Sequence, residues 1–306
     1  MSLVLGIDGG GTKTRASIMD GDRVLSHVEG GSIKRLRVGQ EVADANLRAM
    51  LKEAFAKAGV TRVDAASAGM ASSTLPGVKE WLNGAMIEFG AERSEVVGDE
   101  VIALDAAFKG GPGILQIAGT GSNCIGRMPD GSRECAGGWS SRLGDEGSGY
   151  WIGLHAVRRA LHAYDREEPC GILERVGQIW GTRGMDELID LGNDTPGPDF
   201  AALPPAISEL AEAGDKVALG VLNQAAADLV AFVLLVRDKL RRKHGLVEEV
   251  PVVWIGSIIG KVRIVRESFF AGLQAAAPNM PIGQQEVNGI EGALWRAQQM
   301  AKAAGK

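Results

Sequence analysis

The feature that most constrains this chain is an internal repeat. Residues 5–23, LGIDGGGTKTRASIMDGDR, match residues 115–133, LQIAGTGSNCIGRMPDGSR, at a constant offset without a gap. In both copies an apolar stretch runs into a glycine-rich segment, and an Asp-Gly pair follows near the end. A unit that recurs about one domain length later predicts a fold built from two related halves.

The glycines of the first copy fit neither of two common phosphate-binding motifs. Thr12 interrupts a Walker A pattern, GxxxxGK[ST], and the dinucleotide pattern GxGxxG lacks its third glycine. Downstream, apolar and polar residues alternate around Asp20-Gly21, which predicts a hairpin rather than a helix. The copy therefore reads as strand, glycine turn and strand. For this stretch alone, a hairpin that binds no ligand is the alternative.

Glycine turns of this kind can expose successive backbone amides and form a concave anion site. Two such turns, one from each half and facing each other across a cleft, could hold the phosphates of one nucleotide from both sides. This arrangement is the prediction that the repeat generates.

Six motifs resemble those of the actin-like superfamily of sugar kinases and chaperone ATPases, and more narrowly the N-acetylglucosamine kinase and BadF/BadG group. They occur in family order and span nearly the whole chain: GIDGGGTKT, VVGDE at 96–100, IAGTGSNC at 117–124, GGWSSRLGDEGSGYWIG at 137–153, WIGS at 254–257 and IEGAL at 290–294. The resemblance implies an α/β, duplicated actin-like ATPase (ribonuclease H-like) fold with two lobes and an interdomain cleft.

The rest of the chain agrees with a duplicated α/β fold. Periodicity predicts a helix at 42–59, a strand at 63–70, a helix at 78–90, a strand at 94–99 and a helix at 100–108. Glycines at 109–113 mark a boundary between lobes at 1–112 and 113–306. The second lobe is helix-rich from 148 to 246 and ends in a strand, a helix and a last helix. In the resembled fold the last helix, 290–306, commonly packs back on the first lobe.

The resemblance assigns Asp99 as the catalytic base, because it follows an apolar strand and opens a helix. An ordinary helix cap is its alternative. Asp8 is expected to hold Mg²⁺, through water, or else to be a turn aspartate. Lys13 is either a phosphate neighbour or a solvated lysine. ATP is expected to contact both glycine turns and a later adenosine turn: Gly9, Gly10, Gly11, Thr12, Lys13, Gly119, Thr120, Gly121, Gly256 and Ser257.

The resemblance places a sugar site in the 122–145 block. Asn, Asp and Trp suit a ligand that presents several hydroxyls and an apolar ring face. A core position is the alternative for Trp139. One departure concerns Lys34, which stands where the family typically has an asparagine that reaches the sugar. The expected sugar contacts are Ser122, Asn123, Gly138, Trp139, Ser140, Asp145 and Lys34.

Composition narrows the partners and the compartment. The 306 residues carry a net charge of −5, which favours neither nucleic acid nor a membrane surface as a partner. No uninterrupted apolar run reaches the roughly 20 residues of a bilayer span, and no signal peptide is evident. Three cysteines make no disulfide framework, so a reducing cytoplasm is expected. Cys124 and Cys135 could lie close together on the second hairpin.

The resemblance favours an ATP-dependent kinase that phosphorylates the 6-hydroxyl of N-acetylglucosamine and forms a homodimer. Glucosamine is the close alternative, because GSIIGKV and EVNGIEGALWRA resemble that branch as well. A dehydratase-activating ATPase is the alternative from another class, but it needs cysteine ligands for an iron–sulfur cluster. A sugar-sensing regulator would need a DNA-binding helix pair before the strand that begins at residue 3.

Overall fold

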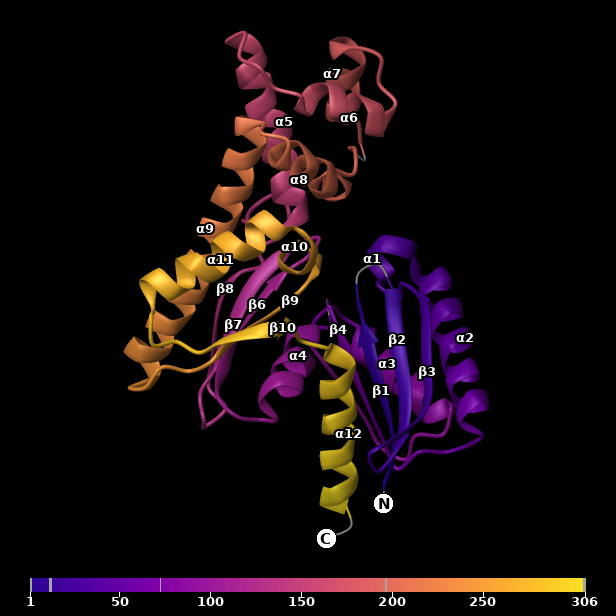
Figure 1. Ribbon diagram of the computed structural model, residues 1–306. Helices are drawn as coiled ribbons and strands as arrows, with labels where there is room; N and C mark the ends of the chain where they lie inside the picture. Colours follow the sequence, from indigo (N-terminus) through magenta and orange to yellow (C-terminus); the bar gives the residue numbers. More distant parts are fainter. Residues whose placement is uncertain (1, 11–12, 72, 196, 305–306) are drawn as a thin grey trace. The chain divides into compact units, whose positions relative to one another are not determined.

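The computed structural model describes residues 2–10, 13–71, 73–195 and 197–304 (Figure 1). It divides into two compact units. Unit 1 consists of Met1–Gly111 together with Val287–Lys306, and unit 2 consists of Pro112–Glu286. The sequence predicts the boundary one residue later and includes the last helix in the range 113–306, with the expectation from the resembled fold that this helix packs back on the first lobe. In the structure that helix belongs to unit 1.

Unit 1 contains a mixed sheet in the order β3-β2-β1-β4-β5. Its central strand β1 runs antiparallel to β2 and parallel to β4. The elements are β1 (Leu3–Gly9), β2 (Lys13–Asp20), β3 (Arg23–Gly31), α1 (Arg35–Val38), α2 (Gln40–Ala58), β4 (Ala65–Met70), α3 (Val78–Glu88), β5 (Ser94–Val97), α4 (Asp99–Phe108) and α12 (Gly289–Ala304).

The alternation along β1 explains how this sheet is covered on both faces. Leu5 and Ile7 pack in one apolar cluster with residues of α2 and α3. Val4 packs on the opposite face with residues of α12. Gly6 belongs to that second face, where a Cβ atom would lie 2.8 Å from Leu294 Cγ. Glycine at this position therefore lets α12 approach the centre of the sheet.

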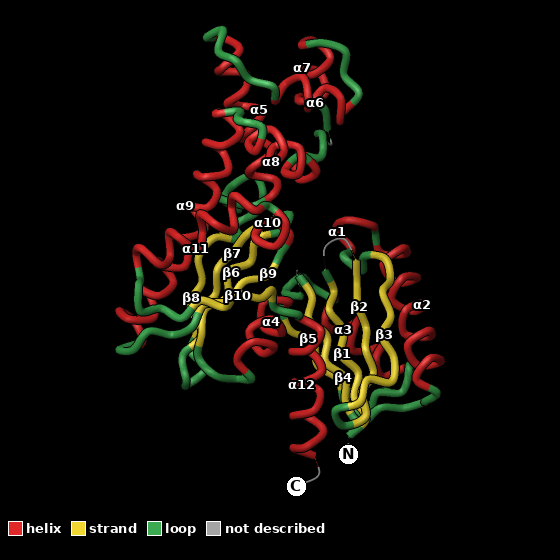
Figure 2. The backbone as a smooth tube through the Cα atoms, in the orientation of Figure 1, coloured by secondary structure: helices red, strands yellow, loops and turns green. Residues whose placement is uncertain are grey.

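Unit 2 repeats the same sheet in the order β10-β9-β6-β7-β8 (Figure 2). Each strand pair has the direction of its counterpart in unit 1, so the predicted duplicated fold is confirmed. The strands are β6 (Gly113–Ala118), β7 (Ser122–Arg127), β8 (Arg133–Gly137), β9 (Val252–Ile255) and β10 (Ile282–Glu286). The helices are α5 (Gly149–Asp165), α6 (Ile172–Trp180), α7 (Met185–Asn193), η1 (Phe200–Ala202), α8 (Pro204–Glu212), α9 (Lys216–His244), α10 (Ser257–Lys261) and α11 (Arg263–Ala276).

The two hairpins differ in a way that the ungapped repeat conceals. Six residues lie between the strand partners Asp8 and Arg15, whereas only three lie between the equivalent Ala118 and its partner Ser122. The next turn reverses the difference, because two residues separate the paired Asp20 and Arg23 but five separate Arg127 and Arg133. The offset between the two repeats therefore stays constant in the sequence, because the first turn is three residues shorter in unit 2 and the second is three residues longer. The residues that pair in β6–β7 are thus shifted by three positions relative to those in β1–β2.

Helix α9 is long and apolar enough, by length and composition alone, to cross a membrane, with 39% of its most apolar window buried. In the structure it packs along α5, α8, α11 and the sheet of unit 2. Its buried residues, which include Val221, Leu229 and Val236, belong to the core of that unit. One such helix is weak evidence for a span, and this packing is typical of a core helix.

An ion-pair network fastens α12 within unit 1. Arg296 binds both oxygens of Glu95 at 2.7 and 2.8 Å and donates to Asp105 Oδ2 at 2.7 Å. Asp105 is 1% exposed, and the Ser67 hydroxyl also donates to Glu95. These contacts join the last helix to β5, α4 and β4, segments almost 200 residues earlier in the chain.

Replacing Arg296 should destabilise unit 1 strongly, because the buried Asp105 carboxylate would lose a strong cationic partner. We expect Arg296→Met to lower the free energy of unfolding by about 3 kcal/mol. Arg48→Met is the matched control: Arg48 also bridges two carboxylates of unit 1, Asp44 and Glu88, but at the exposed surface. It should cost about 1 kcal/mol or less. Urea unfolding followed by circular dichroism measures both, and equal losses would contradict the ranking.

Candidate functional site

The first group of predicted site residues lies in unit 1 where β1 ends. Asp8 is 8% exposed and stands opposite Arg15 in the β1–β2 register. Arg15 Nη2 donates to Asp8 Oδ2 at 2.7 Å. Burial raises the pKa of Asp8, while the guanidinium of Arg15 acts in the opposite direction. The charge of Asp8 therefore depends on this neighbour across the hairpin.

Asp99 is the first residue of α4, directly after β5. Gly98 holds the N-cap position, so Asp99 is not the cap that the sequence left as an alternative. Its Oδ1 accepts a hydrogen bond from the Glu100 amide at 3.1 Å. Burial, together with the neighbouring acids Glu100 and Asp8, raises the pKa of Asp99 to about 7. Their effect outweighs the stabilisation that a helix N-terminus gives a carboxylate.

Three carboxyl groups thus gather in unit 1, with Arg15 as the cation bound to Asp8. Such a group favours a bound divalent cation. No set of three or more His, Cys, Asp or Glu side chains in the described ranges could hold a metal ion directly. A magnesium ion that keeps most of its waters needs only one or two carboxylates, so Asp8 fits a water-mediated site.

The glycine turn of unit 1 is described only in part. Gly11 and Thr12, two of the predicted phosphate contacts, lie outside the described residues. At Gly10 a Cβ atom would lie 2.8 Å from the Lys13 carbonyl oxygen, so the turn is too tight there for a side chain. Lys13 Nζ pairs with Glu29 at 2.8 Å on the surface. This pair accounts for the position of Lys13 without a ligand.

Lys34 is half-buried and precedes the short helix α1. Its amide donates to the Ser32 hydroxyl. The next residue, Arg35, lies over the Trp81 ring at 4.2 Å. The structure therefore places a lysine beside the end of β3, as the alignment of motifs predicted.

The glycine turn of unit 2 directs its carbonyl groups toward α5. The amides of Gly149 and Tyr150 donate to the carbonyl oxygens of Gly119 and Thr120. The Gly119 amide donates to Gly121 O at 2.9 Å. Within the described part of the chain, the amides of Thr120 and Gly121 donate to no backbone acceptor. Two neighbouring unpaired amides in a glycine turn form the start of an anion site.

The predicted sugar block packs against this turn. Asp145, 7% exposed and in the left-handed region at φ 59°, directs Oδ2 to within 2.8 Å of where a Cβ of Gly121 would stand. Ser122 Oγ donates to the Glu146 carbonyl at 2.6 Å, so this hydroxyl holds the block in place. Asn123 Oδ1 is buried, and no described residue donates to it.

Of the remaining block residues, Gly138 lies against Asn123. At Gly138 a Cβ atom would lie 3.0 Å from Asn123 Cβ. Trp139 is 75% exposed, so the alternative that it is a core aromatic is wrong. Ser140 adopts φ 105°, a strained conformation for a residue with a side chain. An exposed indole next in sequence to Gly138, which contacts Asn123 with its buried and unpaired amide oxygen, suits a ligand with an apolar face and polar substituents.

The predicted adenosine turn also lies in unit 2, beside the same hairpin. Gly256 has φ 118°, and a Cβ atom there would collide with the Ala118 carbonyl. Its amide donates to Glu286 Oε1 at 2.9 Å. Ser257 is exposed and opens α10. The structure therefore brings Gly256 to the base of the Gly119–Gly121 turn.

Sequence reasoning missed several residues that shape these sites. Arg15 sets the charge of Asp8, and Glu100 raises the pKa of Asp99. The hairpin pattern could have identified Arg15, because the register of an antiparallel pair fixes which residue faces Asp8. Glu146, which accepts from Ser122, carries no local signal because its backbone makes the contact.

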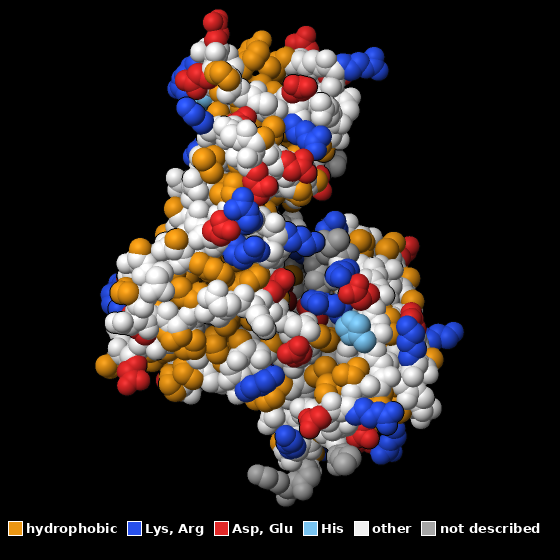
Figure 3. Space-filling model, in the orientation of Figure 1, with side chains coloured by type: hydrophobic (Ala, Val, Ile, Leu, Met, Phe, Trp, Pro, Cys, Tyr) orange, Lys and Arg blue, Asp and Glu red, His pale blue; other side chains and the backbone are white. Residues whose placement is uncertain are grey.

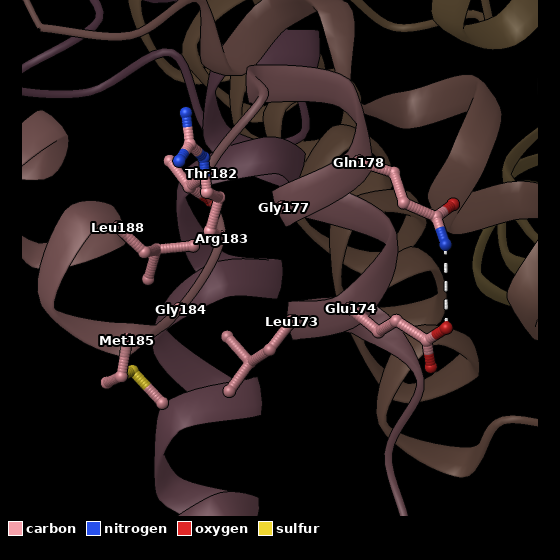
Figure 4. Close-up of a pocket in the computed structure, with 9 residues that line it drawn as sticks. All are labelled: Leu173, Glu174, Gly177, Gln178, Thr182, Arg183, Gly184, Met185 and Leu188. Carbon is pink, nitrogen blue, oxygen red and sulfur yellow. Dashed lines mark hydrogen bonds between the residues drawn. The ribbon is translucent and has the colours of Figure 1, made fainter.

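A separate hollow of about 370 Å³ lies between α6 and α7 (Figure 4). None of its nine lining residues is a predicted site residue. Leu173, Met185 and Leu188 supply its apolar side (Figure 4). The sites assembled from motifs and this hollow are thus different places in unit 2.

Comparison with known proteins gives one family and several relatives. The model of the BadF/BadG/BcrA/BcrD ATPase family matches residues 5–297. An N-acetylmuramic acid/N-acetylglucosamine kinase of Clostridium acetobutylicum is 29% identical over 96% of this chain and 97% of its own. An N-acetyl-D-glucosamine kinase of Dictyostelium discoideum is 29% identical over 92% of both chains. A glucosamine kinase of Vibrio cholerae is 28% identical over 78% of this chain and 82% of its own.

A solved structure is similar over the same extent. It is that of a proposed N-acetylglucosamine kinase from Chromobacterium violaceum, with a TM-score of 0.75 and 26% identity. The match covers 96% of this chain and 98% of that one.

Because the pKa of Asp99 is raised, its ionised form opposes folding. This penalty is absent below about pH 4, where the carboxyl is protonated in both states, and complete above about pH 7. We expect Asp99→Asn to raise the midpoint of thermal unfolding at pH 8, by the equivalent of roughly 1–2 kcal/mol, and to leave it unchanged at pH 4. Differential scanning fluorimetry at both pH values measures this. A variant less stable than the wild type at pH 8 would contradict the assigned environment.

Proposed function

The chain belongs to the BadF/BadG/BcrA/BcrD ATPase family, and on that basis we propose that it is an ATP-dependent kinase that phosphorylates the 6-hydroxyl of an amino sugar. N-acetylglucosamine is the first candidate substrate. One observation carries the proposal. A chain that aligns along most of its length with three amino-sugar kinases holds two buried or half-buried carboxyls, Asp8 and Asp99, at the ends of β1 and β5.

Asp99 is the proposed general base. Phosphoryl transfer to an alcohol needs a group that accepts the hydroxyl proton, and such a base works best when its pKa lies near the working pH. The environment of Asp99 raises its pKa to about 7. Asp99 can therefore accept a proton at neutral pH more readily than an ordinary surface aspartate.

Charge and backbone groups support the other assignments. Asp8 is proposed to hold Mg²⁺ through water, and Mg²⁺ when bound neutralises the charge of the ATP phosphates. The unpaired amides of Thr120 and Gly121 are proposed to bind phosphate oxygens, together with the glycine turn of unit 1. Gly256 and Ser257 are proposed to contact the adenosine.

The sugar is proposed to bind at Asn123, Gly138, Trp139, Ser140 and Asp145, with Ser122 positioning the block through Glu146. Lys34 is proposed as a further contact that selects among amino sugars. The buried Asn123 Oδ1 supports this placement, because a sugar hydroxyl or amide could supply the donor it lacks. A cytoplasmic homodimer completes the proposal.

The alternatives differ in what they require. Glucosamine as substrate is supported by the Vibrio cholerae relative. A dehydratase-activating ATPase would need cysteines exposed for a cluster. Cys124 is fully buried and burial raises the pKa of its thiol, so it is a poor ligand. That leaves Cys135 and Cys170.

A coupled ADP-release assay over a panel of sugars tests the proposed function. We expect turnover with N-acetylglucosamine or glucosamine and little with the corresponding 6-deoxy sugar, which lacks the acceptor hydroxyl. ADP release without any sugar acceptor would instead favour an ATPase of the activator type. An absence of turnover with both amino sugars would reject the kinase.

Replacing Asp99 tests the base. We expect Asp99→Asn to lower kcat at least about 100-fold and to change the ATP dissociation constant little. In the wild type, kcat/KM should fall tenfold per pH unit below about pH 7, where Asp99 is protonated.

Glu100→Gln is the matched control for that measurement. Because it removes an acid that raises the pKa of Asp99, it should keep its turnover and move the acidic limb of the profile to lower pH. If the acidic limb of the kcat/KM profile does not move in Glu100→Gln, or if Asp99→Asn keeps near-normal turnover, another group is the base.

Asp145 tests the sugar site. Asp145→Ala should raise the sugar KM at least about tenfold and leave the ATP KM within about twofold, because a lost hydroxyl partner affects only one substrate. Steady-state kinetics with each substrate varied in turn gives both values. The reverse pattern would move the sugar elsewhere.

A further inference from the structure

A basic face lies on α5, and none of its residues is among the proposed nucleotide or sugar contacts. Five cationic or titratable basic side chains occur between the second turn of this helix and its C-cap, and each lies three or four residues from at least one other, so they form a band on one side. Lys216 joins them from the first turn of α9. We call this set the α5 basic face: His155, Arg158, Arg159, His162, Arg166 and Lys216.

The face contains two adjoining hollows. The first, of about 510 Å³, is lined by His155, Arg158, Arg159, Leu161 and His162. The second, of about 310 Å³, includes Arg166, Lys216 and Glu168 in its lining. Arg159 and His162 line both hollows, so the two are continuous. Figure 3 shows Lys and Arg side chains along the left edge of the helical part of unit 2.

The cations of this face lack acidic partners. Among the described residues, Arg158, Arg159, Arg166 and Lys216 form no ion pair and no side-chain hydrogen bond, whereas most other arginines of the chain do. Acids do lie nearby: the charges of Asp228 and Glu146 act on His155, although neither acid forms an ion pair with this face in the part of the chain that the structure describes. Asp215 caps α9, Asp228 accepts from Gln224, and Glu168 is the acid in the second hollow.

Helix stability does not explain this arrangement. Basic residues in the last turn favour the helix dipole, which accounts for His162 and Arg166. Arg158 and Arg159 lie in the second half of α5 but before its last turn, so the helix dipole does not account for them. In a chain with a net charge of −5, a stripe of unpaired cations is therefore a local feature that calls for an anion.

We propose that the α5 basic face binds a small soluble molecule with two phosphate groups, one in each hollow. Planar guanidinium groups bind phosphate oxygens in pairs, which suits Arg158 and Arg159 in one hollow and Arg166 with Lys216 in the other. Arg166, at the C-cap of α5, is eight positions after Arg158, a rise of about 12 Å along the helix axis. A single phosphate would satisfy only half of the face, so a bisphosphate is the better fit.

This site is independent of the proposed kinase. It lies on the same helix as the amides of Gly149 and Tyr150, which hold the second glycine turn, but shares no residue with the proposed nucleotide or sugar contacts. The ring of His155 stacks on Trp151 at 4.0 Å, one turn from those amides. An occupant would thus contact a helix whose first turn supports the candidate site.

Calorimetric titration of the full chain tests the proposal, with hexane-1,6-diyl bisphosphate and hexyl phosphate as probes at one fixed ionic strength. We expect the bisphosphate to bind at least tenfold more tightly than the monophosphate. Arg158→Gln/Arg159→Gln and Arg166→Gln/Lys216→Gln should each weaken the bisphosphate at least tenfold. Circular dichroism establishes that each variant is folded, and the second variant carries the test if the first is not.

Arg62→Gln/Arg93→Gln is the matched control, because it removes the same charge from the surface of unit 1. It should bind within twofold of the wild type. Equal affinity in all variants, or an equal loss in the control, would overturn the proposal. So would binding to phosphatidic acid vesicles with none to the bisphosphate, since the ligand would then be a lipid surface. Asp99→Asn should bind the bisphosphate with the affinity of the wild type. The binding result can therefore be interpreted even if the kinase assay shows no activity.

Discussion

The ion pair between Asp8 and Arg15 is the interaction on which the chemistry of unit 1 depends. Burial alone favours the neutral form of Asp8, and the guanidinium 2.7 Å away counteracts it. A charged Asp8 in turn raises the pKa of Asp99. One antiparallel register, which sets Arg15 opposite Asp8, thereby adjusts two carboxyls, one on β1 and one at the start of α4. The β1–β2 hairpin therefore reverses the chain and also sets the charge environment of Asp8 and Asp99.

Much of the fold could be predicted from the repeat. A strand, a glycine turn and a second strand occur twice, and the two sheets have matching order and directions. The exchange of three residues between successive turns could not be predicted, because equal losses and gains leave the sequence offset unchanged. The sequence pattern also could not predict the face of the sheet on which α12 packs, because this depends on Gly6 and on the distant partners of Arg296.

The candidate site, like the fold, was predictable from the sequence in its residue types but not in its backbone contacts. Residue types at strand ends and in the glycine turns were predictable from motifs, and Asp8, Asp99 and Asp145 are buried or half-buried as functional acids often are. What the sequence could not provide is the state of backbone groups. Among the described residues, the amides of Thr120 and Gly121 stay without a backbone acceptor in a turn whose carbonyls are bound by α5 amides. Hydrogen bonds between segments about 30 residues apart in sequence are invisible to local patterns.

Unit 1 is assembled from both ends of the chain, with unit 2 encoded between them. During synthesis, β1 and β4 leave the ribosome long before α12 exists, so Val4 and Ala65 lack their apolar cover and Asp105 lacks its arginine. Unit 2 is complete in sequence while its neighbour is still missing a layer. Unit 1 can therefore complete its fold only after residues 287–306 have been synthesised. A nascent chain that stalls before them is exposed to aggregation and proteolysis.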